Sequence, residues 1–156
     1  MRSLIGMSFV CAFVLMVVPI SYQWRWCRPE FVALLIIYWT LYAPQNFGLV
    51  AAWGVGLCQD LLELVPLGFN GLGILVIAYI VYMVHQRIRN YMIWHQSLWV
   101  FVLVGVYLLF SNWLGSFVGR TVDRPVFLLS AVLSALCWPF LVVLMSRLAV
   151  RFRLVQ

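Results

Sequence analysis

Long runs of apolar residues, interrupted at short intervals by charges, prolines and glycines, dominate the sequence. A helix needs about 20 apolar residues to cross the hydrocarbon core of a bilayer. The interruptions leave six runs of roughly that length, so the pattern predicts an all-α polytopic membrane protein with six transmembrane helices in one domain, residues 1–156. The expected spans are residues 3–22, 30–44, 47–64, 69–86, 95–116 and 125–149.

Composition excludes a water-soluble monomer, because 66% of the residues are hydrophobic and only 9% are charged. Soluble domains average about 25% charged residues, so this chain could not cover a wetted surface. The mean hydropathy of +1.06 agrees with this conclusion. All ten basic residues are arginines scattered along the chain. Their placement indicates topology signals in a membrane and not a nucleic-acid-binding surface.

The arginines also predict an orientation, because loops on the cytoplasmic side of a membrane carry an excess of basic residues. With both termini inside, six arginines lie inside and four outside, and the outer side also holds the four acidic residues. The first apolar run lacks a small-residue cleavage site and is expected to remain as an uncleaved helix. The inner arginines are Arg2, Arg87, Arg89, Arg147, Arg151 and Arg153, and the outer ones are Arg25, Arg28, Arg120 and Arg124.

Small residues recur every four positions in the third expected span, at Gly48, Ala52 and Gly56, and the series ends in Asp60. Small residues at this spacing let two helices approach closely, and packing drives helix association in lipid. This face could pack inside the bundle or form a groove for the helix of a partner. A carboxylate is costly in hydrocarbon, so Asp60 is expected near the outer interface, paired with Arg28 or Arg124.

Charges gather at the outer ends of the expected helices. The sequences Arg28-Pro29-Glu30 and Asp123-Arg124-Pro125 open the second and sixth spans. Proline suits the first helical turn, and carboxylates favour the positive end of the helix dipole. Either these are good helix starts with interfacial anchors, or they form an outward-facing rim that docks a partner. The candidate rim consists of Arg28, Glu30, Glu63, Arg120, Asp123 and Arg124.

Two further features concern the shape of the chain. Pro66-Leu67-Gly68 predicts a tight turn into the fourth span. Trp138-Pro139 lies in the middle of the sixth span. Because proline cannot donate a backbone hydrogen bond, Pro139 should kink that helix, and the kink could also form a cleft.

No residue pattern supports catalysis. His85 and His95 are ten residues apart with no third ligand, and the four cysteines are widely spaced, so neither residue type indicates a metal site. The sequence has no nucleophile elbow, HExxH motif, P-loop or dinucleotide fingerprint. We therefore expect no enzyme activity, no metal and no cofactor.

Several short motifs along the chain match one known family. They are RPEFVALLIIYW at residues 28–39, Gly54-x-Gly56-x-x-x-Asp60 followed by Pro66-Leu67-Gly68, then Arg124-Pro125 and Trp138-Pro139. In this order, and with the chain length and six spans, they resemble the rod shape-determining MreD family over nearly the whole sequence. The matching positions are Arg28, Pro29, Tyr38, Gly56, Asp60, Pro66, Gly68, Arg124, Pro125, Trp138 and Pro139.

The resemblance implies a non-catalytic scaffold in the bacterial cytoplasmic membrane. Members of this family bind the bitopic protein MreC and belong with the MreB filament, the RodA glycosyltransferase and its class B transpeptidase, which together support lateral-wall peptidoglycan synthesis and rod shape. The family is also similar in fold to the substrate-binding subunits of ECF vitamin transporters. Fold similarity does not carry function.

Two alternatives remain open. A small-molecule-binding subunit of a transporter would need a polar pocket, for which the spans offer few residues, such as Gln59, Asn70 and Asn112. An intramembrane enzyme would need a positioned nucleophile and base, and the sequence offers no such pair. The leading hypothesis is a scaffold that packs the transmembrane helix of MreC against the Gly48, Ala52 and Gly56 face, with self-association also possible.

Overall fold

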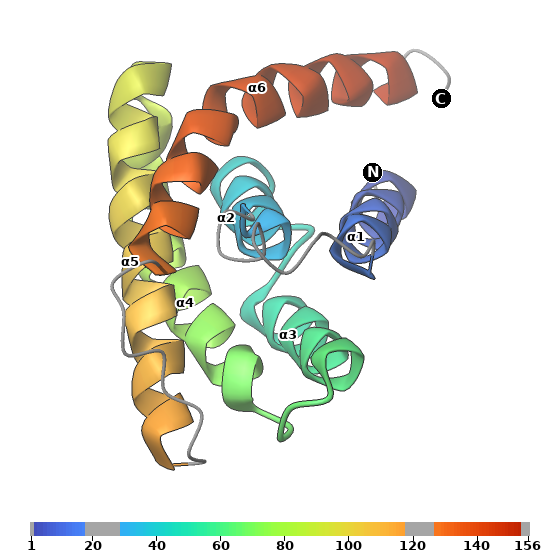
Figure 1. Ribbon diagram of the computed structural model, residues 1–156. Coiled ribbons are helices and arrows are strands. Elements are labelled where there is room, and N and C mark those ends of the chain that lie inside the picture. Colours follow the sequence, from blue (N-terminus) through green and yellow to red (C-terminus); the bar gives the residue numbers. More distant parts are fainter. Residues whose placement is uncertain (1, 18–28, 118–126, 154–156) are drawn as a thin grey trace.

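Six helices and short connections make up the computed structural model, which describes residues 2–17, 29–117 and 127–153 (Figure 1). Every predicted span is a helix, and no strand occurs in these three ranges. The first span was predicted to reach residue 22; its helix is described as far as Val17, and residues 18–28 lie outside the described part. The helices are α1 (Arg2–Val17), α2 (Phe31–Tyr42), α3 (Leu49–Glu63), α4 (Phe69–Arg89), α5 (Ile93–Phe117) and α6 (Phe127–Arg153).

Three of these helices are long and apolar enough to cross a membrane: α4, α5 and residues 129–151 of α6. α1 and α2 are apolar but shorter, and α3 belongs to neither group. At 1.5 Å per residue, the 12 residues of α2 extend about 18 Å, less than the roughly 30 Å of a hydrocarbon core. The all-α class is therefore confirmed, while the count of six transmembrane helices stays a prediction.

The shortest helix, α2, lies in the middle of the bundle, where it contacts α1, α4, α5 and α6 (Figure 1). All ten residues from Val32 to Leu41 are buried. A helix that is apolar on every side is stable only where neighbours cover it completely. This explains why α2 has no polar face: it forms the core on which the other helices pack.

The last helix, α6, changes direction along its length. Its first half runs beside α5, and its second half bends away across α2 towards α1 (Figure 1). Pro139 lies inside this helix. Proline removes one intrahelical hydrogen bond and its ring clashes with the preceding turn, which accounts for the bend of this helix.

Candidate functional site

The small-residue face of α3 is largely taken up by α4 of the same chain. A Cβ atom added to Gly56 would lie 2.6 Å from the Cα atom of Gly71, closer than real contacts allow. Ala52 is fully buried, whereas a Cβ at Gly48 would meet nothing within 4 Å. The backbones of α3 and α4 therefore touch at Gly56 and Gly71. Small residues at this spacing are expected to allow such a close approach. The described residues thus place an intramolecular neighbour on the Ala52–Gly56 part of the stripe.

The carboxylate of Asp60 holds the amino-terminal end of α4. The residue is fully buried. The backbone N–H of Gly68 donates to Oδ2 and that of Asn70 donates to Oδ1, each at 2.7 Å. The N–H of Gly71 adds a longer bond of 3.3 Å to Oδ2. The first N–H groups of a helix have no intrahelical partner and attract negative charge, so Asp60 caps α4 from the neighbouring helix.

A tight turn brings this carboxylate and the start of α4 together. α3 ends with Leu64 in the left-handed conformation at φ 54°, and Gly68 follows at φ 94°. The backbone N–H of Val65 donates to the carbonyl of Asp60 at 3.1 Å, and that of Phe69 donates to the carbonyl of Pro66. The predicted turn at Pro66 and Gly68 is therefore confirmed. Its geometry aims the first N–H groups of α4 back at the end of α3.

A polar network continues from this turn into α5. The Asn70 amide donates to Glu63 Oε2 at 2.7 Å, and the Gln59 amide donates to Glu63 Oε1 at 3.0 Å. The Tyr107 hydroxyl donates to Asn70 Oδ1 at 3.1 Å. Gln59, Asn70 and Tyr107 are buried, and only Glu63 is exposed. Most of these polar groups are satisfied inside the chain, although Gln59 Oε1 and Ser111 Oγ have no partner among the described residues.

Only part of the candidate rim can be located. Glu63 lies in the network above, and the backbone N–H of Glu30 donates to Ser134 Oγ of α6 at 2.9 Å. Pro29 directly precedes α2, and its carbonyl accepts from the N–H of Phe31. The remaining predicted positions lie outside the described residues: Arg28, Arg120, Asp123, Arg124 and Pro125. The predicted pairing of Asp60 with one of these arginines therefore stays a prediction.

The middle of α6 is held by hydrogen bonds to Gln96, at the end of the bundle where α2 and α4 finish and α5 begins. Trp138 is fully buried, and its indole N–H donates to Gln96 Oε1 at 3.4 Å. The Tyr42 hydroxyl donates to the same oxygen at 3.1 Å. The Gln96 amide donates to the carbonyls of Ile88 and Tyr91. One buried glutamine of α5 thus ties α2, α6 and the end of α4 together.

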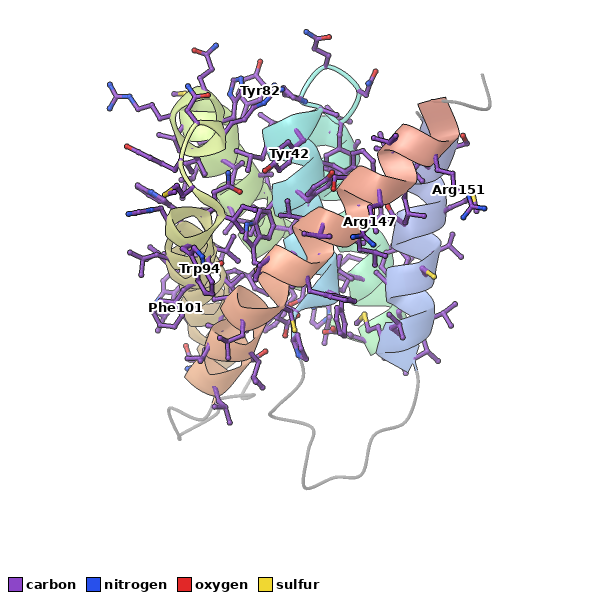
Figure 2. The ribbon with its side chains drawn as sticks, turned by 90° about the horizontal axis from the view of Figure 1, so that it is seen from above. Tyr42, Tyr82, Trp94, Phe101, Arg147 and Arg151 are labelled. Atoms are coloured by element: carbon purple, nitrogen blue, oxygen red, sulfur yellow. The ribbon has the colours of Figure 1, made fainter. Side chains whose placement is uncertain are left out.

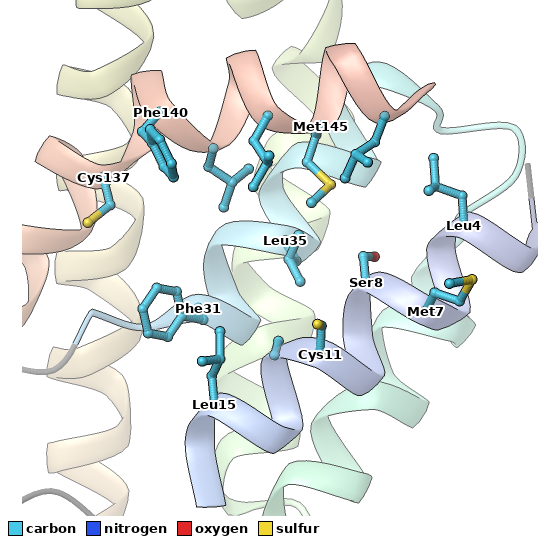
Figure 3. A pocket seen from close by; sticks show the side chains of 14 residues that line it. Leu4, Met7, Ser8, Cys11, Leu15, Phe31, Leu35, Cys137, Phe140 and Met145 are labelled. Carbon is cyan, nitrogen blue, oxygen red and sulfur yellow. The ribbon is translucent and has the colours of Figure 1, made fainter. Parts of the chain in front are cut away.

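An open apolar cleft lies between α1 and the second half of α6, with α2 as its floor (Figure 3). Its volume is about 480 Å³. Figure 3 shows Cys11 of α1, Leu35 of α2 and Phe140 of α6 facing this space. The cleft begins where α6 bends away from α5, and none of the described helices covers the exposed side chains of Phe140 and Leu144 on this stretch. The lining residues are Leu4, Met7, Ser8, Cys11, Ala12, Leu15, Phe31, Leu35, Cys137, Phe140, Leu141, Leu144, Met145 and Leu148.

The apolar lining of the cleft between α1 and α6 suits the packing of another helix. No group of three or more metal-binding side chains occurs within residues 2–17, 29–117 and 127–153. The buried polar side chains are mostly bonded to one another or to helix ends, and the cleft between α1 and α6 is lined, apart from Ser8, by aliphatic, aromatic and sulfur-containing residues. In lipid, a face of this kind associates through van der Waals packing.

Sequence comparison assigns the chain to a family. Residues 1–148 match the family described as "rod shape-determining protein MreD". The chain belongs to the MreD family. A curated relative, the rod shape-determining protein MreD of Haemophilus influenzae, is 27% identical over 94% of this chain and 90% of its own length. No solved structure matches the chain significantly, so the ECF-like architecture stays a prediction.

Membership of the MreD family confirms the sequence resemblance and supports a role in determining rod shape. Together with the three long apolar helices, it indicates an integral membrane protein. Several family-matching positions have clear structural tasks. Asp60 caps α4, Gly56 lets α3 contact α4, and Trp138 anchors α6. Tyr38 packs edge-on against Trp138 with ring centroids 6.4 Å apart.

Three residues with evident roles were not singled out from the sequence. Ser8 accepts a hydrogen bond from the indole N–H of Trp39 at 3.0 Å, which joins α1 to α2. Gln96 and Tyr107 form the two polar centres described above. An isolated polar side chain inside an apolar span is the signal that could have identified Gln96, because such a group requires buried partners.

Proposed function

We propose that this chain is a non-catalytic scaffold of the bacterial elongation complex, which binds the transmembrane helix of MreC in the cleft between α1 and α6. The proposal combines family membership with one structural observation, the open apolar cleft. In this role the chain works in the cytoplasmic membrane with MreB, RodA and its class B transpeptidase. It supports lateral-wall peptidoglycan synthesis without carrying out a reaction.

The cleft is a better place for a partner helix than the small-residue face of α3. Gly56 already contacts α4, whereas the α6 wall of the cleft holds the exposed side chains of Phe140 and Leu144. Helices in lipid associate when their side chains interlock, because lipid tails supply no hydrophobic drive. A single bitopic helix laid along α1 and α6 would cover both walls and replace the missing neighbour of the bent helix.

The arginines at the helix ends indicate how the proposed complex is oriented in the membrane. Arg87 and Arg89 lie at the end of α4, and Arg147 and Arg151 lie near the end of α6. An excess of arginine marks the cytoplasmic side, so we place both termini there, with six spans and the turn around Gly68 facing outwards. A reporter fused to each connection should be active on the side that this topology assigns.

Native cysteines allow a direct test of the proposed contact. Cys11 and Cys137 line the cleft from opposite walls, whereas Cys58 is exposed on α3. Each is retained alone in the full chain, with the other cysteines changed to serine, and paired in cells with a cysteine scan of the MreC transmembrane helix. Oxidation should crosslink Cys11 and Cys137 at positions repeating every three to four residues of MreC. Crosslinks through Cys58 alone would overturn the proposed site.

A matched pair of substitutions separates loss of binding from loss of fold. Cys11→Trp fills the cleft, and Cys58→Trp adds the same bulk to an exposed position on α3. A cost of about 1.4 kcal/mol at the interface corresponds to a tenfold loss of affinity. We expect Cys11→Trp to reduce co-purified MreC by about tenfold and Cys58→Trp to leave it unchanged. Equal recovery of MreC with both variants would contradict the proposal.

A further inference from the structure

A polar pocket opens at the arginine-bearing end of the bundle, between the connection from α2 to α3 and the last turns of α4. Its volume is about 560 Å³. Figure 2 shows Tyr42 and Tyr82 near this end of the helices. The family role described above makes no use of the pocket. It is lined by Tyr42, Ala43, Pro44, Gln45, Asn46, His85, Gln86, Arg89 and Asn90.

The charge at this end is positive. Arg87 and Arg89 are exposed in the last turn of α4, and two arginines exceed the roughly half negative charge at the carboxyl end of a helix. The acidic side chains that the structure describes, Glu30, Asp60 and Glu63, lie at the other ends of α2 and α3. With α4 about 30 Å long, they are too distant to neutralise the pocket. The pocket therefore favours an anion.

Donor groups in the pocket suit a phosphate. The guanidinium of Arg89 presents a fork of N–H groups that matches phosphate oxygens. The amides of Gln45 and Gln86, both exposed, add neutral donors around it. His85 Nδ1 lies 2.7 Å from the carbonyl of Tyr82, which orients the ring and leaves Nε2 available to a ligand.

An apolar track leads from the pocket along α4. Tyr79 and Met83 are exposed, and they lie on the same face of the helix as Gln86 because they precede it by seven and three residues. Tyr82 is also exposed and stacks on the ring of His85, with centroids 5.8 Å apart. Tyrosines of this kind mark the level of lipid headgroups. A phosphate above and an apolar track below are the two parts of a phospholipid.

We propose that this pocket binds the phosphate of an anionic phospholipid on the arginine-rich side of the membrane, with an acyl chain lying along Tyr79 and Met83. Basic pockets between membrane helices on the cytoplasmic side bind anionic headgroups. An acidic segment of a partner protein would satisfy Arg89 but would make no use of the apolar track. The site is independent of the MreC cleft, because the two share no residue.

Binding can be counted by native mass spectrometry of the full chain, purified in detergent and stripped of lipid. The probes are dioleoyl phosphatidylglycerol and dioleoyl phosphatidylcholine, each with and without excess inorganic phosphate or a polyglutamate peptide. We expect one tightly held phosphatidylglycerol per chain, weaker binding of phosphatidylcholine, and no displacement by phosphate or peptide. Equal binding of the two lipids would overturn the proposal. Displacement by phosphate would show a site for a free anion, and displacement by the peptide would show a site for an acidic segment.

Matched variants identify the residues involved. Arg89→Gln removes the charge in the pocket, and Arg151→Gln removes an exposed charge on α6 outside it. A basic residue near an anionic surface contributes about 1 kcal/mol, so Arg89→Gln should weaken phosphatidylglycerol binding about fivefold. Arg151→Gln should leave it unchanged, and Met83→Ser should weaken both lipids. Equal losses in the two arginine variants would mean diffuse attraction and would refute the site. Retention of MreC crosslinking in Arg89→Gln would show that the scaffold role stands separately.

Discussion

Replacing Asp60 tests the central structural conclusion, that a family-matching carboxylate caps α4 from the neighbouring helix. Its two oxygens each accept a backbone N–H at 2.7 Å, from Gly68 and Asn70. A hydrogen bond to a charged group contributes about 1.5–3 kcal/mol when its partner is buried. Losing both bonds in Asp60→Ala should therefore lower the free energy of unfolding by about 3–6 kcal/mol.

The isosteric change Asp60→Asn should have a smaller effect. The amide keeps one acceptor oxygen, but its NH₂ group must face either the N–H of Gly68 or that of Asn70, so one donor loses its partner. Leaving one buried donor unsatisfied costs about 1–3 kcal/mol. The expected order of stability is wild type, then Asp60→Asn, then Asp60→Ala.

The measurement is reversible unfolding in mixed detergent micelles, followed by circular dichroism. Arg87→Gln serves as the control, because Arg87 is exposed in the last turn of α4. Removal of that charge should cost less than about 1 kcal/mol. If Asp60→Ala destabilises the chain no more than Arg87→Gln does, the capping argument is wrong. Asp60 would then have to act through a partner.

Three other substitutions follow from the packing. Gly56→Ala forces a Cβ to within 2.6 Å of the Cα of Gly71 and should cost about 1–3 kcal/mol in the same unfolding assay, whereas Gly48→Ala, which meets nothing within 4 Å, should be neutral. Pro139→Ala restores a backbone hydrogen bond and should straighten α6. Crosslinking of MreC to the cleft should then decrease, while thermal stability should not. Undiminished crosslinking would contradict the role of the bend. Gln96→Leu strands the Tyr42 hydroxyl and should lower stability by about 1–3 kcal/mol without altering the amount of protein inserted in the membrane. An unchanged unfolding midpoint would show that Gln96 does not join the helices.

The apolar pattern was sufficient to predict the elements of the fold. All six predicted segments are helices, as expected of long apolar runs between prolines, glycines and charges, because such a run can satisfy its backbone groups in lipid only as a helix. The turn at Pro66 and Gly68 and the kink at Pro139 were also predictable, because glycine and proline restrict the backbone locally. The helices, the turn and the bend were predictable because each depends mainly on residues that are close in the sequence.

Partners of individual side chains were not predictable in the same way. The spacing of Gly48, Ala52 and Gly56 showed that a helix could approach, but α4 or a partner would have matched it equally well. Asp60 was expected to pair with an arginine, whereas its partners among the described residues are backbone N–H groups at the start of α4. A carboxylate accepts either kind of donor, so its choice depends on which group the turn brings within reach.

By itself, the sequence determined that the chain is helical and apolar enough for a membrane, roughly where its helices lie, and to which family it belongs. Only the tertiary structure decided that α2 forms the core, that α4 occupies the small-residue face, and that the bend of α6 opens a cleft beside α1. The physical reason is the solvent. In lipid every apolar face is equally acceptable, so hydrophobicity selects the helices but leaves their neighbours to shape and to a few buried polar groups.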